Sequence, residues 1–325
     1  MRTGVLVVLL AVVCCNSAAV TPAPIDPPHV DGDASTGPDG GPVEEGGSDA
    51  ADAALPTGAG NLRVMAANIS CGPSLNYDPA EAVRIFQGLR PDVVLIQELK
   101  VGANSTAELD AYVSTTFGAT FSYYREQGAG FDIPNGIISR YPILASGTWV
   151  DPAVANRGFA YAKLALPGPH PLWAISLHLL TTGATQRSTE VVELVKQVKA
   201  VVPPEDYLVL GGDFNTATRN EDCIANSVTG LAAIVGTAAP YPADGAGNAN
   251  TSLARSKPHD WLLADPDLGP RSVPVAIGQG SFAAGLVFDS RVYMPLADVA
   301  PVQATDSAAQ NMQHMPVVRD FRIPQ

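Results

Sequence analysis

The amino-acid sequence predicts a layered α/β fold for residues 61–325, and three observations support this prediction. The chain has 325 residues, of which 46% are hydrophobic and 16% charged, so a sizeable apolar core can form. Short apolar runs bounded by polar or turn residues recur along the chain and indicate buried strands. Helical and strand patterns alternate in the first half of this region, and strand patterns dominate the second half.

The first residues have the composition of an export signal. Arg2 precedes an apolar run from Val5 to Val13, and this run is too short to span a bilayer as a helix. Cys14 and Cys15 end the run, where a bacterial lipoprotein carries its lipid-modified cysteine. We therefore expect residues 1–17 to be a signal peptide of an exported protein, either secreted or tethered to a membrane as a bacterial lipoprotein. A buried N-terminal helix is a third alternative.

Residues 18–60 predict a disordered tether. They are rich in Pro, Gly, Ala, Asp and Ser and contain almost no large apolar residue, so they cannot bury enough surface to offset the entropy of ordering. The formal net charge of the chain is -13, and much of it comes from the acidic residues of this segment. The remaining chain is only mildly acidic and lacks the broad basic surface of most duplex-binding proteins. A nucleic acid held through a metal ion stays compatible with this charge.

The predicted elements follow from apolar spacing and from start signals. The segment 78–89 opens on Asp78-Pro79 and then repeats apolar residues at helical spacing. The segment 188–201 is also amphipathic, with Ser188 at the cap position. In chain order we predict strand 62–70, helix 78–89, strands 91–98, 136–144, 161–166 and 171–180, helix 188–201, and strands 206–212, 259–265 and 316–323. Residues 277–288 fit a strand–turn–strand of the core or, alternatively, an exposed apolar hairpin.

Polar side chains follow several of these apolar runs. Asn68, Glu98 and His178 each come at the end of a predicted strand, and Asp213 and Asn215 follow the strand 206–212. Strands of one sheet end on a common edge, and polar groups placed there converge on one site. The sequence therefore predicts a polar site at this edge.

This set of residue types suits the hydrolysis of a phosphoester. Glu98 is a hard oxygen ligand for a divalent cation, and Mg²⁺ characteristically takes one or two carboxylates. Asp213 can orient or deprotonate an attacking water, and Asn68 and Asn215 can donate amide hydrogens to a phosphate. His178 and His314 can donate to the phosphate oxygens or protonate a leaving group, and Asp260 can fix one imidazole in a single tautomer.

Each of these residues also has a simpler explanation. Glu98 could be a solvated charge at a strand end, and Asp213 with Asn215 could simply form a turn. His178 could be a structural histidine of an alternating strand, and Asp260 could belong to a surface pair. The joint pattern, more than any single residue, favours a catalytic site.

Seven motifs resemble, in the same order, those of the endonuclease/exonuclease/phosphatase (DNase I-like) superfamily, which includes pancreatic-type DNases, bacterial sphingomyelinases and inositol polyphosphate phosphatases. The motifs are RVMAANIS, PDVVLIQE, NGIISRYPI, ISLHLL, LVLGGDFNT, HDWLL and QHMPVV. The resemblance covers roughly Asn61 to Phe321. It implies an α+β sandwich in which two mixed β-sheets pack face to face with helices on the outside, and it makes residues 61–325 the catalytic domain.

The resemblance also implies a role for each matched residue. Glu98 would be the principal Mg²⁺ ligand, with Asn68 beside it. Asn135 and Arg157 match polar positions near the site and would bind substrate. The implied catalytic residues are His178, Asp213, Asn215, Asp260 and His314.

One position departs from the family pattern. The family usually has Ser-Asp-His before its final strand, and here the triplet is Met312-Gln313-His314. A neutral amide at Gln313 brings no charge to a metal site, so we expect weaker metal affinity and a metal preference that can include Mn²⁺ or Ca²⁺ beside Mg²⁺. We also expect a disulfide between Cys71 and Cys223, because both follow strand ends that rise on the same face. Two separate buried thiols are the alternative.

The sequence thus predicts a monomeric, Mg²⁺-dependent phosphoesterase that cleaves a phosphodiester outside the cytoplasm. A nucleic acid, a phospholipid and a small phosphodiester are the competing substrates, with a nuclease or general phosphodiesterase favoured. The alternative is a non-catalytic binding lipoprotein that keeps the fold, and Gln313 is the feature that favours it.

Overall fold

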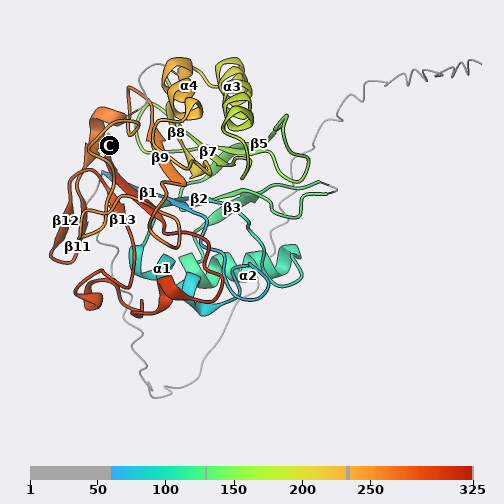
Figure 1. The fold of residues 1–325 in the computed structure, drawn as a ribbon. Helices are drawn as coiled ribbons and strands as arrows, with labels where there is room; N and C mark the ends of the chain where they lie inside the picture. Colours follow the sequence, from blue (N-terminus) through green and yellow to red (C-terminus); the bar gives the residue numbers. More distant parts are fainter. Residues whose placement is uncertain (1–59, 129, 232–234, 324–325) are drawn as a thin grey trace, which may run out of the picture. The chain divides into compact units, whose positions relative to one another are not determined.

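Two β-sheets occupy the centre of the structure, which is a computed structural model that describes residues 60–128, 130–231 and 235–323 (Figure 1). The predicted signal peptide and tether, with Cys14 and Cys15, lie outside the described residues. Within the described ranges, none of the helices is both long and apolar enough to cross a membrane.

The first sheet has seven strands and mixed direction. Its order is β10-β14-β1-β2-β4-β3, and β13 also pairs with β14. The neighbours β1 and β2 are parallel, whereas β14 and β4 run antiparallel to them. Its strands are β1 (Asn61–Ala67), β2 (Val93–Ile96), β3 (Ser122–Arg125), β4 (Gly136–Ser139), β10 (Ser272–Val273), β13 (Leu286–Val287) and β14 (Val317–Arg322).

The second sheet has five strands in the order β5-β6-β7-β8-β9. Only β7 and β8 are parallel. Its strands are β5 (Ile143–Trp149), β6 (Phe159–Leu164), β7 (Leu172–His178), β8 (Tyr207–Asp213) and β9 (Asp260–Ala264). A separate hairpin joins β11 (Val275–Ile277) to β12 (Gly280–Phe282). The predicted 277–288 segment therefore contains the end of β11, then β12, then β13 of the first sheet. Ile277 and residues 286–288 are buried in the core, whereas Ser281 and Ala283 are exposed.

The two sheets pack face to face with helices on both outer sides (Figure 1). Small and aliphatic residues of β6 to β9 share one apolar cluster with β1, β2 and β14, and α1 and α2 bury their apolar faces in the same cluster. A second apolar cluster lies between the other face of the second sheet and α3 and α4. The predicted sandwich of two mixed sheets is therefore confirmed.

The helices agree with the sequence only in part. Helix α3 begins four residues before Ser188, so Ser188 is not its cap. Helix α2 starts with a capping box formed by Ser105 and Glu108, a signal that the sequence prediction did not use. The helices are α1 (Ala80–Leu89), α2 (Thr106–Phe117), α3 (Ala184–Val201) and α4 (Asp222–Leu231), with short 3₁₀ turns at Gly269–Arg271, Leu296–Val299 and Asp306–Ala308.

The predicted disulfide is wrong. Cys71 and Cys223 are both free, buried thiols. Cys71 belongs to the apolar cluster between the sheets, whereas Cys223 lies on α4 in the cluster outside the second sheet. Burial raises the pKa of Cys71 to about 11 and that of Cys223 to about 12, so both behave as small core residues rather than as reactive thiols.

The glycine pair at the end of β8 allows the two sheets to approach closely. Gly212 has φ +133°, and a Cβ atom there would lie 2.5 Å from Gln97 Nε2 and even closer to the carbonyl oxygen of Leu177. Gln97 follows β2 of the first sheet and donates a 2.8 Å hydrogen bond to Ser176 Oγ of β7 in the second sheet. The absence of a side chain at Gly212 therefore makes room for a polar bridge between the sheets.

We predict that Gly212→Ala destabilises the fold by roughly 2–4 kcal/mol, because the methyl group meets backbone in a conformation that favours glycine. Gly245→Ala is the matched control, since an added Cβ there has nothing within 4 Å, and its effect should be within about 0.5 kcal/mol. Denaturant unfolding measures both. Equal effects of the two substitutions would contradict a close approach at Gly212.

Candidate functional site

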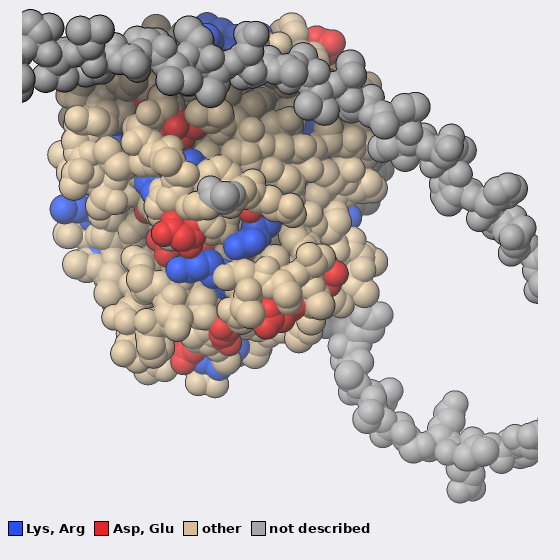
Figure 2. All heavy atoms as spheres, turned by 90° about the vertical axis from the view of Figure 1, so that its right-hand side faces the viewer, with Lys and Arg blue, Asp and Glu red and all other residues tan. Residues whose placement is uncertain are grey.

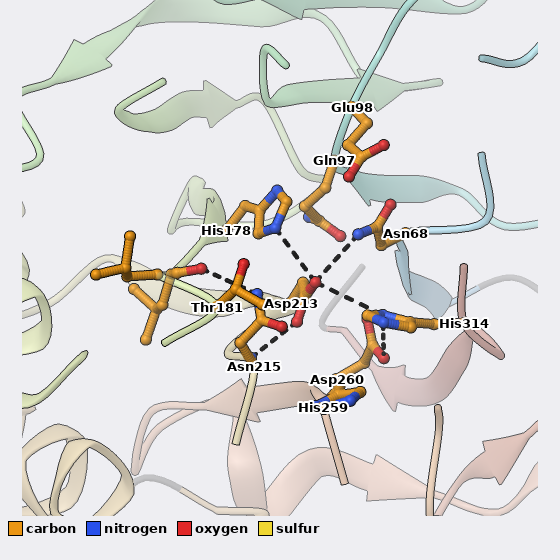
Figure 3. Close-up of polar contacts among 12 residues, drawn as sticks. Asn68, Gln97, Glu98, His178, Thr181, Asp213, Asn215, His259, Asp260 and His314 are labelled. Carbon is orange, nitrogen blue, oxygen red and sulfur yellow. Dashed lines mark hydrogen bonds and ion pairs between the residues drawn. The ribbon is translucent and has the colours of Figure 1, made fainter. Parts of the chain in front are cut away.

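The predicted polar residues converge at one edge of the sandwich (Figure 3). The parallel strands β1, β2, β7 and β8 reach this edge with their carboxyl ends. The antiparallel strands β9 and β14 begin there, so Asp260 opens β9 and His314 lies just before β14. Within the second sheet, His178 is in register with Asp213, and Asp213 with Asp260, so these three residues form a row across neighbouring strands.

The carboxylate of Asp213 is the centre of the site. It is 2% exposed, and its Oδ2 atom faces side chains from both sheets. Asn68 Nδ2 donates to this oxygen at 3.1 Å, His178 Nε2 lies 3.3 Å away and His314 Nδ1 lies 3.6 Å away. Asp213 is therefore held in one orientation by groups from the ends of β1 and β7 and from the segment before β14.

The spacing of Asp213 and Asn215 has a local structural cause. Asp213 Oδ1 accepts a 2.8 Å hydrogen bond from the backbone N–H of Asn215. Asn215 adopts φ +52°, which Asn tolerates better than most residues, and its Nδ2 donates to the carbonyl oxygen of Leu179 at 3.0 Å. The two residues do form a turn, as the simpler explanation proposed, and this turn also fixes the carboxylate at the strand end.

His314 and Asp260 form a buried pair. His314 Nδ1 lies 3.0 Å from Asp260 Oδ2 and 3.2 Å from its Oδ1. Burial alone would lower the pKa of His314, but the carboxylates of Asp260 and Asp213 outweigh it and raise this pKa to about 9. His314 is therefore a cation at neutral pH. The ring of His259 packs against the ring of His314 with centroids 4.9 Å apart. Burial lowers the pKa of His259, and the positive charge of His314 lowers it further.

His178 has the opposite protonation state. Burial lowers its pKa to about 4, although the Asp213 carboxylate acts in the other direction. The ring is therefore neutral at neutral pH, and its buried Nδ1 atom has no hydrogen-bond partner among the described residues. A neutral imidazole with one unused nitrogen can exchange a hydrogen bond with a bound molecule.

Glu98 and Asn68 offer hard oxygen ligands beside this centre. Glu98 is 8% exposed and adopts φ +55°, an uncommon backbone conformation for a residue with a side chain. Burial raises the pKa of its carboxyl group, and Ser70 Oγ donates to Oε2 at 2.9 Å. Asn68 Oδ1 is buried and has no partner among the described residues, because the amide of Asn68 turns its nitrogen toward Asp213. An unused amide oxygen next to a buried carboxylate fits a Mg²⁺ ligand set.

A second group of side chains could also hold a metal ion. Asp213, Asp260 and His314 offer ligand atoms that all lie within 4.8 Å of one another. In the structure, however, His314 Nδ1 already faces both carboxylates and is protonated at neutral pH. A proton and a cation compete for this nitrogen, so the group can hold a metal ion only after His314 loses its proton, whereas the amide oxygen of Asn68 needs no such change.

Asn135 and Arg157 hold backbone carbonyl groups near the site. Asn135 Nδ2 donates to the carbonyl oxygen of Gly158 at 2.7 Å. Arg157 is 5% exposed, and its guanidinium donates to the carbonyl oxygens of His178 and, at 3.0 Å, Leu179. Both side chains are buried and donate to backbone carbonyl groups, whereas Asn135 Oδ1 has no partner among the described residues. Substrate binding by these two residues stays a prediction.

Gln313 lies beside the site and is half-buried. Its backbone N–H donates to the carbonyl oxygen of Ser70 at 3.2 Å, and that of His314 donates to the carbonyl oxygen of Asn68 at 3.1 Å. The segment before β14 is thus attached to the end of β1. This attachment brings His314 to Asp213 and places the uncharged Gln313 next to the Ser70 side of the site.

Three residues of the site are not identified by the sequence pattern. They are Ser70, which binds Glu98, Gln97, which bridges the sheets, and His259, which packs on His314. Ser70 and Gln97 lie within two residues of predicted site positions. A polar residue at the end of a buried strand was therefore the signal that could have identified them. His259 stands next to Asp260 and so gave the same signal, but its contact with His314 depends on a partner far along the chain.

Comparison with known proteins identifies the family. The model of the endonuclease/exonuclease/phosphatase family matches residues 65–284, and the chain belongs to this family. None of the curated proteins matches the chain.

Solved structures of this family show the same fold. One is an endonuclease/exonuclease/phosphatase from Bacteroides vulgatus, with 17% identity and a TM-score of 0.56 over 81% of this chain and 99% of that one. A second, from Beutenbergia cavernae, has 16% identity and a TM-score of 0.54 over 81% and 72% of the two chains. A third, an AP endonuclease from Archaeoglobus fulgidus, has 15% identity and a TM-score of 0.51 over 80% and 99%. At such identities these likenesses concern the fold alone.

We predict that the His314–Asp260 pair makes folding stability depend on pH. The folded-state pKa of His314, about 9, exceeds its ordinary value of 6.5. The pair therefore stabilises the fold fully below pH 6.5, and this contribution is lost as the pH rises through about 9. In metal-free protein, denaturant unfolding should show this loss, and Asp260→Asn should reduce it.

His170→Gln is the control for this experiment, because His170 lies outside the site, against the ring of Tyr207. It should leave the pH dependence unchanged. NMR titration of the His314 ring gives the direct measurement, and an ordinary or lowered pKa in the metal-free wild type would overturn the assignment.

Proposed function

We propose that this protein hydrolyses a phosphodiester by metal-assisted in-line attack of water. The observation that carries the proposal is the buried Asp213 carboxylate, which contacts Asn68 and two histidines of opposite protonation state in a member of a phosphoesterase family. This arrangement combines a base, a cationic donor and hard oxygen ligands within one site. The exported location and the monomeric state expected from the sequence remain part of this proposal.

Asp213 orients the attacking water. Its Oδ1 and Oδ2 atoms are fixed by Asn215 N–H and Asn68 Nδ2, so a water hydrogen-bonded to the carboxylate would approach phosphorus from a constant direction. The carboxylate also accepts a proton from the water as the new P–O bond forms. The bond from phosphorus to the leaving oxygen breaks in the same step, and the cationic His314 can protonate that oxygen.

Glu98 and Asn68 would hold the divalent cation, and Mg²⁺ is the proposed ion. When bound, the cation polarises a phosphoryl oxygen and neutralises developing charge. The low exposure of Glu98 and the unpartnered Oδ1 of Asn68 are the features of this chain that support the assignment. Ser70 keeps the Glu98 carboxylate in place through its hydroxyl.

The two histidines divide the remaining work. His314 is held as a cation by Asp260 and can stabilise the negative charge that builds up on the phosphate oxygens. His178 is neutral and can hydrogen-bond a phosphate oxygen or the water without adding charge. Arg157 holds the carbonyl oxygen of His178 and so maintains the direction of that ring.

The face shown in Figure 2 favours a substrate that is recognised through few charges. Basic residues near the centre of this face lie beside acidic ones, and no extended basic patch is seen on it. A long duplex usually needs such a patch. A small phosphodiester or a short stretch of nucleic acid therefore fits better, and a phospholipid is the runner-up.

We predict that Glu98→Gln and Asp213→Asn each reduce kcat by at least about 10²-fold, because each removes a charge from the reacting centre. Glu205→Gln is the control, since Glu205 is exposed and away from the site, and it should keep the wild-type rate. The measurement is a hydrolysis panel of plasmid DNA, RNA, sphingomyelin and an activated bis-aryl phosphodiester. Unchanged rates in both site variants would mean that the measured activity comes from a contaminant.

We predict that Gln313→Asp lowers the Mg²⁺ concentration needed for half-maximal activity, because it restores the carboxylate that the family usually has. Gln310→Asp adds the same charge at an exposed nearby position and should leave that concentration unchanged. Titrations with Mg²⁺, Mn²⁺ and Ca²⁺ test this. A wild type inactive with all three ions, and active only as Gln313→Asp, would favour the alternative of a non-catalytic binding protein.

A further inference from the structure

A cavity of about 360 Å³ lies beside the strand β14. Its walls come from the segment 235–240, the strand β10 and the segment 283–285. Arg319 and Asp320 of β14 complete the lining. None of the predicted catalytic or metal-binding residues lines this cavity.

Arg319 is a buried cation for which the described residues provide no ion pair. Its side chain is 5% exposed, and its Nε atom is buried with no hydrogen-bond partner among the described residues. No carboxylate of the described chain forms an ion pair with it, and burial is the one cause that lowers its pKa, to about 10. Arg319 is therefore still charged at neutral pH.

The other charged residue of the cavity is already compensated. Asp320 accepts two hydrogen bonds from Arg63, at 2.8 Å from Nε and at 2.7 Å from Nη2. Because both oxygens of the Asp320 carboxylate are paired with Arg63, Asp320 does not compensate the charge of Arg319. The cavity thus carries one uncompensated positive charge, on the guanidinium of Arg319.

Two glycines shape the space around Arg319. A Cβ atom at Gly236 would lie 3.1 Å from Nη2 of Arg319, and one at Gly285 would lie 3.1 Å from its Cγ. Gly236 has φ +111° and Gly285 has φ +104°, conformations in which a side chain is strained. The backbone therefore packs closely on both the head and the stem of this arginine and limits the directions from which a ligand can reach it.

We propose that this cavity binds a small organic anion through its carboxylate or phosphate group, which Arg319 recognises. A buried charge without a partner is strongly unfavourable, and an oxyanion would supply two parallel hydrogen bonds to the guanidinium fork. The walls next to Arg319 include Ala238, Pro240, Val273 and Ala284, so a short apolar group on the anion has matching surface. The site is independent of the proposed hydrolysis.

The test uses the full chain with a chelator present and inorganic phosphate and acetate as probes, each exchanged against chloride at constant ionic strength. Thermal unfolding and calorimetric titration should show that at least one probe stabilises and binds the wild type. Arg319→Met should weaken that binding by about tenfold or more, and it should keep the hydrolysis rate of the wild type. Arg322→Met is the matched control, because Arg322 lies on the same strand and is exposed, and it should bind the probe as the wild type does.

A further variant keeps the proposal testable if Arg319→Met does not fold. Ala284→Phe leaves Arg319 in place and fills the cavity from its wall, so it should also abolish the stabilisation by the probe. The proposal is overturned if neither probe binds the wild type. It is also overturned if Arg319→Met, or Ala284→Phe in its place, binds as tightly as Arg322→Met. Phosphate that binds only at the catalytic site gives this second outcome.

Discussion

The site depends on holding the ionised Asp213 carboxylate out of water. A carboxylate that is 2% exposed is unfavourable unless hydrogen bonds and positive charge replace its hydration. Here the replacement comes from the Asn215 backbone, the Asn68 amide and the His314 cation. Asn68 directly follows β1 and His314 lies just before β14, both strands of the first sheet, whereas Asp213 ends β8 of the second. The carboxylate is therefore satisfied only when the two sheets are packed in the observed relation. The catalytic centre can therefore form only together with the packing of the two sheets.

The same carboxylate explains why two nearby histidines differ. His178 faces Asp213 alone, and the neighbouring Arg157 and His314 add positive charge, so burial prevails and the ring stays neutral. His314 faces both Asp213 and Asp260, and the two negative charges together outweigh burial. Environment, rather than residue type, thus separates a neutral hydrogen-bonding ring from a cationic one. A phosphate with developing negative charge can use both kinds of group at once.

The sequence predicted the parts of the site that are local to parallel strands. Asn68, Glu98 and Asp213 each end or follow an apolar run, so a simple rule of strand ends located them. Asp260 and His314 lie at the starts of antiparallel strands, where no rule of strand ends applies. Their residue types suggested a role, and the family resemblance supplied their place in the site. The sequence did not predict helix α4 or the start of α3 at Ala184, because tertiary packing fixes both. The disulfide prediction failed for a related reason. Cys71 and Cys223 each follow a strand that ends at the site, but the fold places them in two different apolar clusters.

Asp213 and Arg319 show two outcomes for a buried charge in one fold. Asp213 is surrounded by donors, so the fold itself offsets the loss of water. Arg319 is more than nine-tenths buried, its neighbour Asp320 is paired with Arg63, and nothing in the described chain offsets its charge. The uncompensated charge of Arg319 has no structural use in the described part of the fold. A neutral side chain of similar length would pack in its place without the desolvation penalty. A bound anion would give this charge such a use, since the ligand completes the hydrogen bonds that the protein leaves open.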